Sequence, residues 1–139
     1  MRRAAAVLIL SFGLAGQALA ASPAEGRWRT QSQNGEVKVE ACGEALCGYV
    51  VTSERLEAEP EMKDVENKNP ALRGRLLKGL MFLDGFTGGP TEWKGGRVYN
   101  PDDGGTYKGT IKLVGPDTLK LTGCITWPLC KTQTWRRIK

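Results

Sequence analysis

The amino-acid sequence predicts an all-β domain, built as a small antiparallel up-and-down β-barrel with one long loop and a short helical turn. Short runs alternate between apolar and polar residues, as in "EVKVEAC" (36–42), "YKGTIKLV" (107–114) and "TLKLTG" (118–123). A period of two is typical of strands with one face in the core and one in water. Links such as "SQNGE" and "NPDDGGT" combine the residues that favour turns. A β-sandwich has the same periodicity and stays open as the alternative.

The first twenty residues predict a secretory signal peptide. A short basic start, "MRR", precedes the apolar run "AAAVLILSFGLAG", and "ALA" at 18–20 places small residues before Ala21. These are the three parts of a Sec-type signal that is removed after export, and the apolar run is shorter than the roughly 20 residues of a membrane span. We therefore expect a periplasmic or secreted protein with no membrane span, residues 21–25 as a flexible tail, and residues 26–139 as a single barrel domain.

Composition and charge exclude several classes of function. Residues 1–20 hold two of the 20 basic residues and none of the 15 acidic ones, so their removal leaves 119 residues with a net charge of +3 instead of +5. A charge this mild and this evenly scattered does not favour nucleic acid as a partner. The chain contains no histidine. This excludes imidazole catalysis, Ser–His and Cys–His nucleophiles, and zinc sites with histidine ligands.

The inward faces of the predicted strands decide whether the barrel is filled or hollow. The side chains that we assign to these faces are those of Val39, Val50, Tyr107, Ile111, Leu113, Leu119, Leu121 and Trp135. Gly48, Gly109 and Gly123 fall on the same faces. Glycine at such positions removes side-chain volume and favours a cavity, although a glycine in a strand can equally mark a bulge or a corner of the barrel.

Residues 53–69, "SERLEAEPEMKDVENKN", interrupt the alternating pattern. Their dense charge is typical of a long exposed loop. In "NPALR", Asn69 is suited to cap a helical turn that has Pro70 at its first position. The apolar run "LLKGLMFLDGF" (76–86) follows and predicts a further strand.

The two ends of the predicted domain contain complementary residues. "GRW" at 26–28 opens the first strand, and "TWRRIK" at 134–139 closes the last. Closure of a barrel would bring Arg137 over Trp28 beside Trp135, with a stabilisation of about 0.5–2 kcal/mol. A Gly-x-Trp start with an arginine on the final strand resembles the calycins, the group of lipocalins and avidins. A core tryptophan with an unrelated surface arginine is the alternative.

A wider set of motifs extends this resemblance. In chain order they are "GRW", "CGEALCG", "NPALRGRLLKG", "GGRVYNPDDGGTY" and "LCKTQTWRR". Together they resemble the bacterial exported family catalogued as domain of unknown function 2147, which looks calycin-like. The resemblance runs from Gly26 to Arg137 and implies a small barrel and an exported protein, but no reaction. The acidic loop at 53–68, and Leu76 where the family often has proline, depart from the pattern and put only the loop geometry in doubt.

Four cysteines occur as two close pairs, in "ACGEALCGYV" and "GCITWPLCK". In an oxidising compartment such pairs are typical of disulfides. A zinc site with four thiolates would need them reduced. A catalytic redox pair usually has two residues between its cysteines, whereas these pairs have four and five. We therefore expect two disulfides and no metal site.

Hairpin geometry selects which cysteines pair. A hairpin that turns at residues 44–45 would place Cys42 opposite Cys47 and Val39 opposite Val50. Cross-strand neighbours lie within reach of a disulfide, so we predict Cys42–Cys47.

The last hairpin follows the same logic. Cys124 would fall opposite Cys130, in the register that sets Leu119 across from Trp135. We therefore predict a Cys124–Cys130 disulfide, and the main effect of both short links would be to hold the register of their hairpins.

Polar residues near the long loop and the turn after it are candidates for a binding site. They are Asp64, Asn67, Asn69, Arg73 and Arg75, followed by Tyr99, Asn100, Asp102, Asp103 and Tyr107. The guanidinium groups could hold an anionic head group at a barrel mouth, or they could pin the loop through Asp64 while Asn69 caps a turn. Asp102 and Asp103 have ordinary turn composition rather than the regular ligand spacing of a calcium loop. Trp93 and Trp127 flank loops, as rim aromatics or as packing residues. The ligand-binding candidates are Arg73, Arg75, Asp64, Asn69, Tyr107 and Trp93.

Three functions are compatible with these features: an envelope protein that binds a small, partly apolar or amphiphilic ligand, a structural or interaction module with a filled interior, and a hydrolase or lyase with Asp64 or a glutamate as base. An eight-stranded barrel suits either of the first two, which a cavity volume would separate. No acid–base pair, nucleophile or metal set is recognisable, so we expect a non-enzymatic protein with no cofactor. The binding hypothesis predicts a closed end at Trp28, Trp135 and Arg137, and a mouth under the 53–69 loop.

Overall fold

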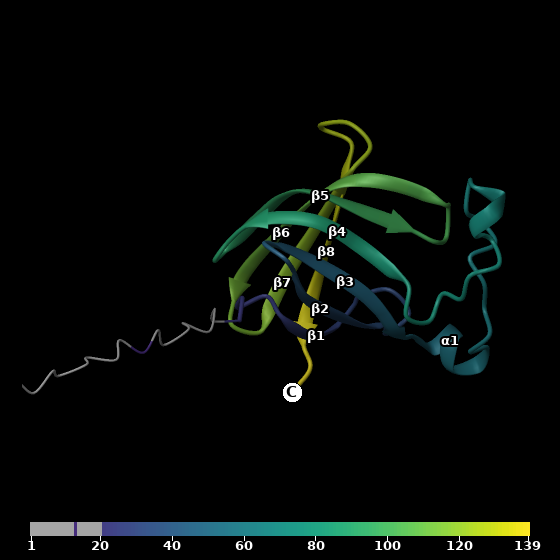
Figure 1. Ribbon diagram of the computed structural model, residues 1–139, viewed down its shortest axis with the longest axis horizontal. Coiled ribbons are helices and arrows are strands. Elements are labelled where there is room, and N and C mark those ends of the chain that lie inside the picture. The colour runs from purple at the N-terminus through teal and green to yellow at the C-terminus, as the bar shows by residue number, and fades with distance from the viewer. Residues whose placement is uncertain (1–12, 14–20) are drawn as a thin grey trace, which may run out of the picture.

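The computed structural model describes Gly13 and residues 21–139, so the predicted signal peptide, apart from Gly13, lies outside the described residues. These residues form eight antiparallel strands in one closed barrel, each paired with the next along the chain (Figure 1). The strands are β1 (Gly26–Arg29), β2 (Glu36–Cys42), β3 (Ala45–Thr52), β4 (Met81–Gly88), β5 (Glu92–Asn100), β6 (Gly105–Gly115), β7 (Thr118–Cys124) and β8 (Cys130–Arg137). Closure comes from the pairing of Trp28 with Arg137 and of Arg29 with Arg136. The predicted barrel is confirmed, and the sandwich alternative is wrong.

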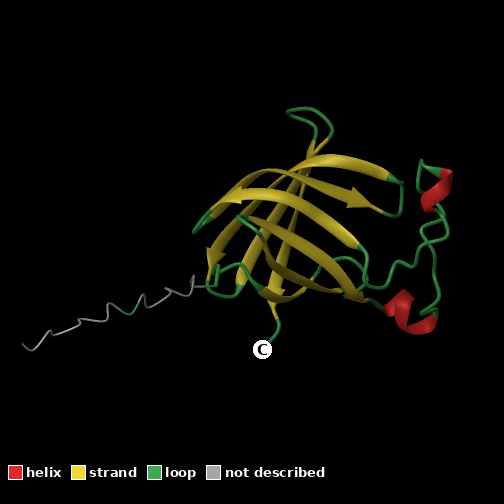
Figure 2. Ribbon diagram, viewed as in Figure 1, coloured by secondary structure: helices red, strands yellow, loops and turns green. Residues whose placement is uncertain are grey.

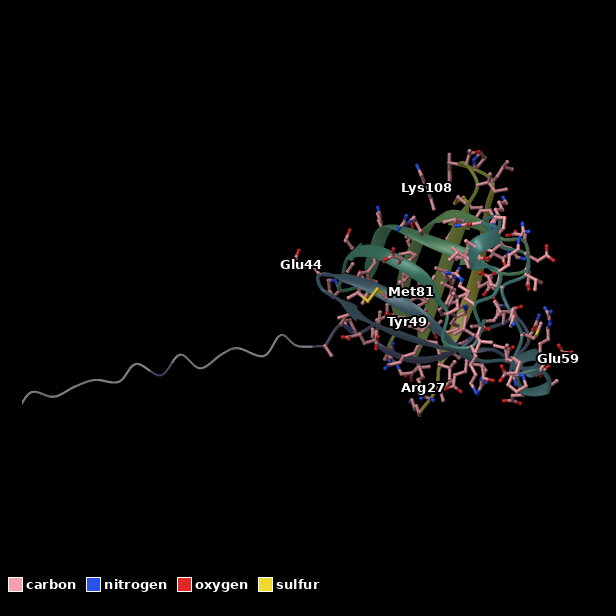
Figure 3. All side chains as sticks on the ribbon, turned by 45° about the vertical axis from the view of Figure 1, so that its right-hand side comes forward. Arg27, Glu44, Tyr49, Glu59, Met81 and Lys108 are labelled. Carbon is pink, nitrogen blue, oxygen red and sulfur yellow. A yellow bond between two sulfur atoms is a disulfide. The ribbon has the colours of Figure 1, made fainter. Side chains whose placement is uncertain are left out.

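Connections between consecutive strands alternate between the two ends of the barrel, because every pair is antiparallel. The end that we call the closed end carries residues 21–25, the turns 43–44, 89–91 and 116–117, and the C-terminus. The opposite end, called the open end, carries residues 30–35, 53–80, 101–104 and 125–129. Figure 3 labels one residue from each, Glu44 and Glu59, on opposite sides of the molecule.

The long connection between β3 and β4 contains the two short helices of the described residues, α1 (Glu54–Ala58) and η1 (Pro70–Leu72), drawn in red in Figure 2. Asn69 caps η1 as predicted, since its side-chain oxygen accepts a hydrogen bond from the Ala71 backbone N–H at 3.1 Å. Helix α1 was not predicted; its cap is Ser53, which accepts from the Leu56 N–H at 3.2 Å.

Strand β4 begins at Met81, five residues later than the apolar run at 76–86 predicts. The first residues of that run instead stay within the loop, where the Leu77 N–H donates to the Met62 carbonyl at 2.9 Å. A bridge between Lys63 and Leu76 accompanies this contact. The backbone partners of Leu76 and Leu77 therefore come from the loop itself, and hydrogen bonds to β3 begin only at Gly79 and Leu80, which pair with Val50.

Two large side chains from β4 fill the closed half of the barrel. Phe86 is fully buried against Gly96 and Gly109, where an added Cβ would lie 2.4 Å and 2.8 Å from the Phe86 ring. Leu83 covers Gly48 in the same way, at 2.6 Å. The prediction that Gly48 and Gly109 leave empty space is therefore wrong, because these glycines make room for neighbouring side chains. Gly48 also lies at an irregularity in the β3–β4 pairing, the alternative considered for a glycine in a strand.

Both predicted disulfides, Cys42–Cys47 and Cys124–Cys130, are present. The last hairpin has the predicted register, with Cys124 opposite Cys130. The first hairpin does not, because it turns at residues 43–44 and sets Cys42 opposite Ala45. Gly43 explains the difference: its φ of 64° supplies the left-handed backbone that a two-residue hairpin turn requires.

In consequence the Cys42–Cys47 link runs diagonally between β2 and β3. Cys47 lies opposite Glu40, and Val37 rather than Val39 lies opposite Val50. The Cα atoms of the two cysteines are 5.8 Å apart, against 4.0 Å in the directly opposed pair of the last hairpin. The diagonal separation lies within the usual range for a disulfide, so the correct link did not depend on the correct register.

The closed end is sealed by residues 21–25, which we expected to be a flexible tail. Ala24 is fully buried, and its carbonyl accepts a hydrogen bond from Trp28 Nε1 at 3.0 Å. Arg137 lies over the Trp28 ring, with its Cζ 4.3 Å from the ring centroid, as the closure motif predicts. The same guanidinium donates to the carbonyls of Glu25 at 2.8 Å and Pro23 at 2.6 Å. These contacts place the segment across the barrel end.

Candidate functional site

A cavity of about 760 Å³ occupies the half of the barrel that the β4 side chains do not fill. Its inner wall is mainly apolar and includes Val37, Phe82, Val98, Leu121 and Trp135. All the connections of the open end contribute to its mouth, from the β1–β2 loop to the β7–β8 hairpin. The cavity therefore begins at a layer of aromatic and aliphatic side chains and leads to water beneath the long loop.

Gly123 is the strand glycine for which the cavity prediction holds. It lines the cavity, and the nearest atom to an added Cβ would be the Tyr107 Cβ at 3.7 Å, an ordinary contact. Gly109, its direct partner on β6, faces the Phe86 ring instead. The boundary between filled and hollow space therefore passes between two glycines that are paired across adjacent strands.

The β5–β6 turn places a polar pair, Asp103 and Tyr107, at the mouth of the cavity. Asp103 accepts hydrogen bonds from the Tyr107 hydroxyl at 2.5 Å and from the Gly105 N–H at 2.7 Å. The Tyr107 hydrogen bond, with that of Gly105, holds the pKa of Asp103 below its ordinary value, while the same carboxylate raises the pKa of Tyr107. Near neutral pH the pair therefore presents one negative charge and a protonated phenol.

Helix α1 forms part of the roof of the cavity. Leu56 is buried and lines the cavity from above. Arg55, on the same helix, forms an ion pair of 3.4 Å with Asp102 on the β5–β6 turn. Both charged side chains are more than half exposed, so this link between the roof and the barrel rim is a weak one.

Asp64 lies outside the cavity, in a buried network that anchors the long loop to β5. Its Oδ2 accepts from Arg75 Nε at 2.8 Å and from Asn67 Nδ2 at 2.9 Å. Its Oδ1 accepts from the Tyr99 hydroxyl at 2.5 Å. Burial raises the pKa of Asp64, but the hydrogen bonds from Tyr99, Asn67 and Arg75 outweigh burial and lower that pKa overall.

The other members of this network also serve the loop. Arg75 lies over the Tyr99 ring at 5.4 Å, and burial together with the Asp64 carboxylate raises the pKa of that phenol. Arg73 donates from Nε to the Asn67 carbonyl at 2.8 Å. Neither arginine lines the main cavity. The geometry thus matches the alternative in which these groups pin the loop.

The remaining residues that were considered for the binding site lie in separate parts of the molecule. Asn69 caps η1 and, with Arg75, borders a second hollow of about 510 Å³ between the long loop and the outside of β4 and β5. Trp93 is buried in the core near the closed end. Trp127 is the most exposed of the large apolar side chains among the described residues, at the tip of the β7–β8 hairpin. Of the six ligand-binding candidates, Tyr107 alone lines the main cavity.

Sequence reasoning identified part of the cavity wall, since Val50, Tyr107, Leu121 and Trp135 were assigned inward and line the cavity, and it missed other parts. Phe82 lies in a run that is apolar on both faces, so no alternation identified its inward direction. Gln133 has the inward parity of Trp135 and hydrogen-bonds to it, with Trp135 Nε1 donating to Gln133 Oε1 at 3.0 Å. Because the last hairpin was predicted correctly, the position of Gln133 two residues before Trp135 could have identified it as a polar side chain that faces the cavity.

Within residues 21–139, no three His, Cys, Asp or Glu side chains gather in a group that could hold a metal ion. None of the helices in this part of the chain is long and apolar enough to span a bilayer.

Comparisons with known proteins identify the family. A family model described as an uncharacterised protein conserved in bacteria (DUF2147) matches residues 26–137. The solved structure of protein HP1028 from the human pathogen Helicobacter pylori, reported to belong to the lipocalin family, is similar at 29% identity and a TM-score of 0.76. That similarity covers 83% of this chain and 82% of the other. No curated protein sequence matches the chain. The predicted family and its lipocalin-like character are confirmed.

Proposed function

The chain belongs to the DUF2147 family of bacterial proteins, and we propose that it is a non-enzymatic binding protein of the cell envelope that holds a small amphiphilic ligand in its barrel. The cavity is the observation that carries this proposal. Its volume of about 760 Å³ lies within the range of about 300–1,000 Å³ that small-molecule sites occupy. A filled structural module would leave no such space.

The distribution of polarity indicates how the ligand lies. The inner wall offers aliphatic and aromatic side chains, whereas Lys131, Arg55 and Asp103 lie at the mouth. An amphiphile would therefore place its apolar body against Trp135 and its polar head at the rim. The head-group site proposed at Arg73 and Arg75 is replaced by this rim, which carries both signs of charge and does not select an anion.

The proposed location combines several observations. The two disulfides are typical of an oxidising compartment, and the family is bacterial. We propose that residues 1–20 act as the export signal and that the mature protein works in the periplasm or is secreted. N-terminal sequencing of the exported protein tests this point: a start at Ala21 supports it, and a chain that retains Met1 contradicts it.

The chemistry of Asp64 supports a binding role over hydrolysis. A general base near neutral pH works best when its pKa lies close to that pH. The pKa of Asp64 is instead lowered, and the lone pairs of its carboxylate are directed to three donors. Asp64 is also separate from the cavity in which a substrate would lie.

A neutral fluorescent probe, N-phenyl-naphthylamine, tests the cavity directly. We expect the purified protein to bind it, with enhanced fluorescence. A Gly123→Leu variant should bind the probe about tenfold more weakly or worse, because the new side chain would occupy the cavity. Gly115→Leu is the matched control, since nothing lies within 4 Å of a Cβ at that position.

Equal probe binding by the two leucine variants would contradict the proposal, as would a wild-type protein that binds no probe. Circular dichroism of each variant checks that the barrel remains folded. Mass spectrometry of organic extracts from periplasm-purified protein would then identify the natural ligand.

A further inference from the structure

The tip of the β7–β8 hairpin exposes three large apolar side chains. Ile125 is 69% exposed, Trp127 85% and Leu129 65%. The Cys124–Cys130 disulfide and the hydrogen bond from the Ile125 N–H to the Leu129 carbonyl at 3.1 Å close the base of the tip. A tip constrained in this way cannot readily fold back to bury its apolar groups. Exposed apolar side chains that cluster, rather than occurring singly, mark interaction sites.

The strands that carry this tip are basic. Asp117 is the last acidic residue in the chain, so residues 118–139 contain lysine and arginine but no carboxylate side chain. Lys108 on β6 is paired with Cys124 at the base of the tip, and Figure 3 shows its side chain close to the tip. Further along the wall Lys112 and Lys120 are directly opposite each other. Lys112 also lies opposite Glu92 on β5 and, like Val114, toward the closed end, so the basic side chains that adjoin the tip are Lys108 and Lys131.

The apolar tip is continuous with the cavity. Ile125 and Leu129 belong both to the exposed tip and to the lining of the cavity mouth. A surface that received the tip would therefore lie directly against the opening. An apolar ligand could move between that surface and the inner wall without crossing water.

We propose that the tip residues 125–129 insert into the interface of an anionic lipid bilayer and place the cavity mouth against the membrane. Tryptophan favours the boundary between head groups and acyl chains, where its ring is buried and its N–H stays solvated. Lysines next to an inserted segment are attracted to anionic lipids. A protruding apolar tip suits a fluid surface that closes around it, whereas a protein partner would need a matching concave pocket.

The test uses protein purified from the periplasm of an expression host, with its N-terminus determined, and two kinds of vesicle. One kind contains phosphatidylcholine alone, and the other also contains phosphatidylglycerol. We expect cosedimentation with the anionic vesicles, weakened by salt, and quenching of tryptophan fluorescence by brominated acyl chains. Trp127→Ser should lose most of both signals, while Val114→Ser should retain them. Val114 is a matched control because it is 53% exposed and lies near the closed end.

The charge contribution is tested separately by Lys108→Gln, which should weaken binding to the anionic vesicles about fivefold. Binding of Trp127→Ser equal to that of Val114→Ser would overturn the proposal, as would a wild-type protein that binds neither vesicle. Self-association that depends on Trp127, seen by analytical ultracentrifugation without vesicle binding, would overturn it in favour of a second copy of the chain. Binding of N-phenyl-naphthylamine in vesicle-free solution should be unchanged in Trp127→Ser, so this proposal and the binding function can fail independently.

Discussion

The closed half and the open half of the barrel are built from the same strands but reach different interiors. In the closed half, Phe86 and Leu83 lie against glycines of neighbouring strands and are almost fully buried. In the open half, Gly123 faces empty space, and the aromatic side chains of Phe82 and Trp135 line a cavity. One interior is closely packed, and the other is roofed by a polar loop.

The difference shows that a glycine on an inward face does not define a cavity by itself. What matters is whether a neighbouring strand supplies a side chain long enough to reach it. At Gly109 the Phe86 ring comes within 2.8 Å of an added Cβ, whereas at Gly123 the nearest side-chain atoms, from Tyr107 and Val98, stay at ordinary contact distances of 3.7 Å and 3.9 Å. The energetics should differ accordingly: apolar packing stabilises the closed half, whereas hydrogen bonds and ion pairs secure the roof of the open half.

The largest effect is expected from loss of the Phe86 ring. Phe86→Ala should lower the free energy of unfolding by about 3–5 kcal/mol, because a fully buried ring leaves a cavity between Gly96 and Gly109. Phe82→Ala should cost only about 1–2 kcal/mol, because Phe82 is partly buried and already borders empty volume. Urea unfolding followed by circular dichroism measures both.

The Phe82 and Phe86 variants also report on the cavity. Equal losses of stability would mean that the two halves are packed alike, which contradicts the comparison. Probe binding should persist in Phe82→Ala, since removal of that ring enlarges the cavity and does not close it.

The second prediction concerns the roof. Asp64→Asn should destabilise the protein by about 2–3 kcal/mol at pH 7, because the amide replaces a carboxylate that accepts from Arg75, Asn67 and Tyr99. The folded-state pKa of Asp64 is lowered, so its contribution to stability is fully present above the unfolded value of about 3.9 and is lost as the pH falls through the folded value.

A pH series distinguishes this electrostatic role from packing. The difference in stability between wild type and Asp64→Asn should shrink below about pH 4. The cost of Phe86→Ala should change little over the same range, since no titrating group is removed. A pH-independent cost for Asp64→Asn would show that the carboxylate charge does not secure the roof.

The sequence predicted the barrel, both disulfides and the Trp28–Arg137 contact because each depends on local periodicity or short spacing. Alternation identified Leu119, Leu121 and Ile111 as inward, and all three are buried. The cavity opens under the 53–69 loop, where the sequence placed its mouth, but the boundary between the hollow half and the filled half could not be located in the same way. Its position depends on which β4 side chains cross the barrel, and the apolar run at 76–86 has no alternation to show this.

The site residues show a second limit. Arg73 and Arg75 were candidates because guanidinium groups bind anions, but residue type alone does not reveal an internal partner. Asp64, eleven residues before Arg75 along the chain, meets it only after the loop has folded back through the Lys63–Leu76 bridge, and Arg73 donates to the Asn67 carbonyl instead. Contacts between distant parts of the chain also place Pro23 and Glu25 against Arg137 at the closed end, which their own sequence does not indicate.

The smallest effect is expected from a single methyl group at the boundary between the two halves. Gly109→Ala would place its Cβ 2.7 Å from Val98 Cγ2 and 2.8 Å from the Phe86 ring, so we expect a loss of about 1–3 kcal/mol from overpacking. Gly123→Ala meets nothing closer than 3.7 Å. It should be neutral or stabilising by up to about 1 kcal/mol, because alanine reduces the freedom of the unfolded chain. The two glycines are direct cross-strand partners, so the change in strand propensity from glycine to alanine should be nearly the same at both. The difference in unfolding free energy between the two variants therefore reports the space that each glycine faces. A Gly123→Ala variant as unstable as Gly109→Ala would show that the cavity wall at Gly123 is closed in solution.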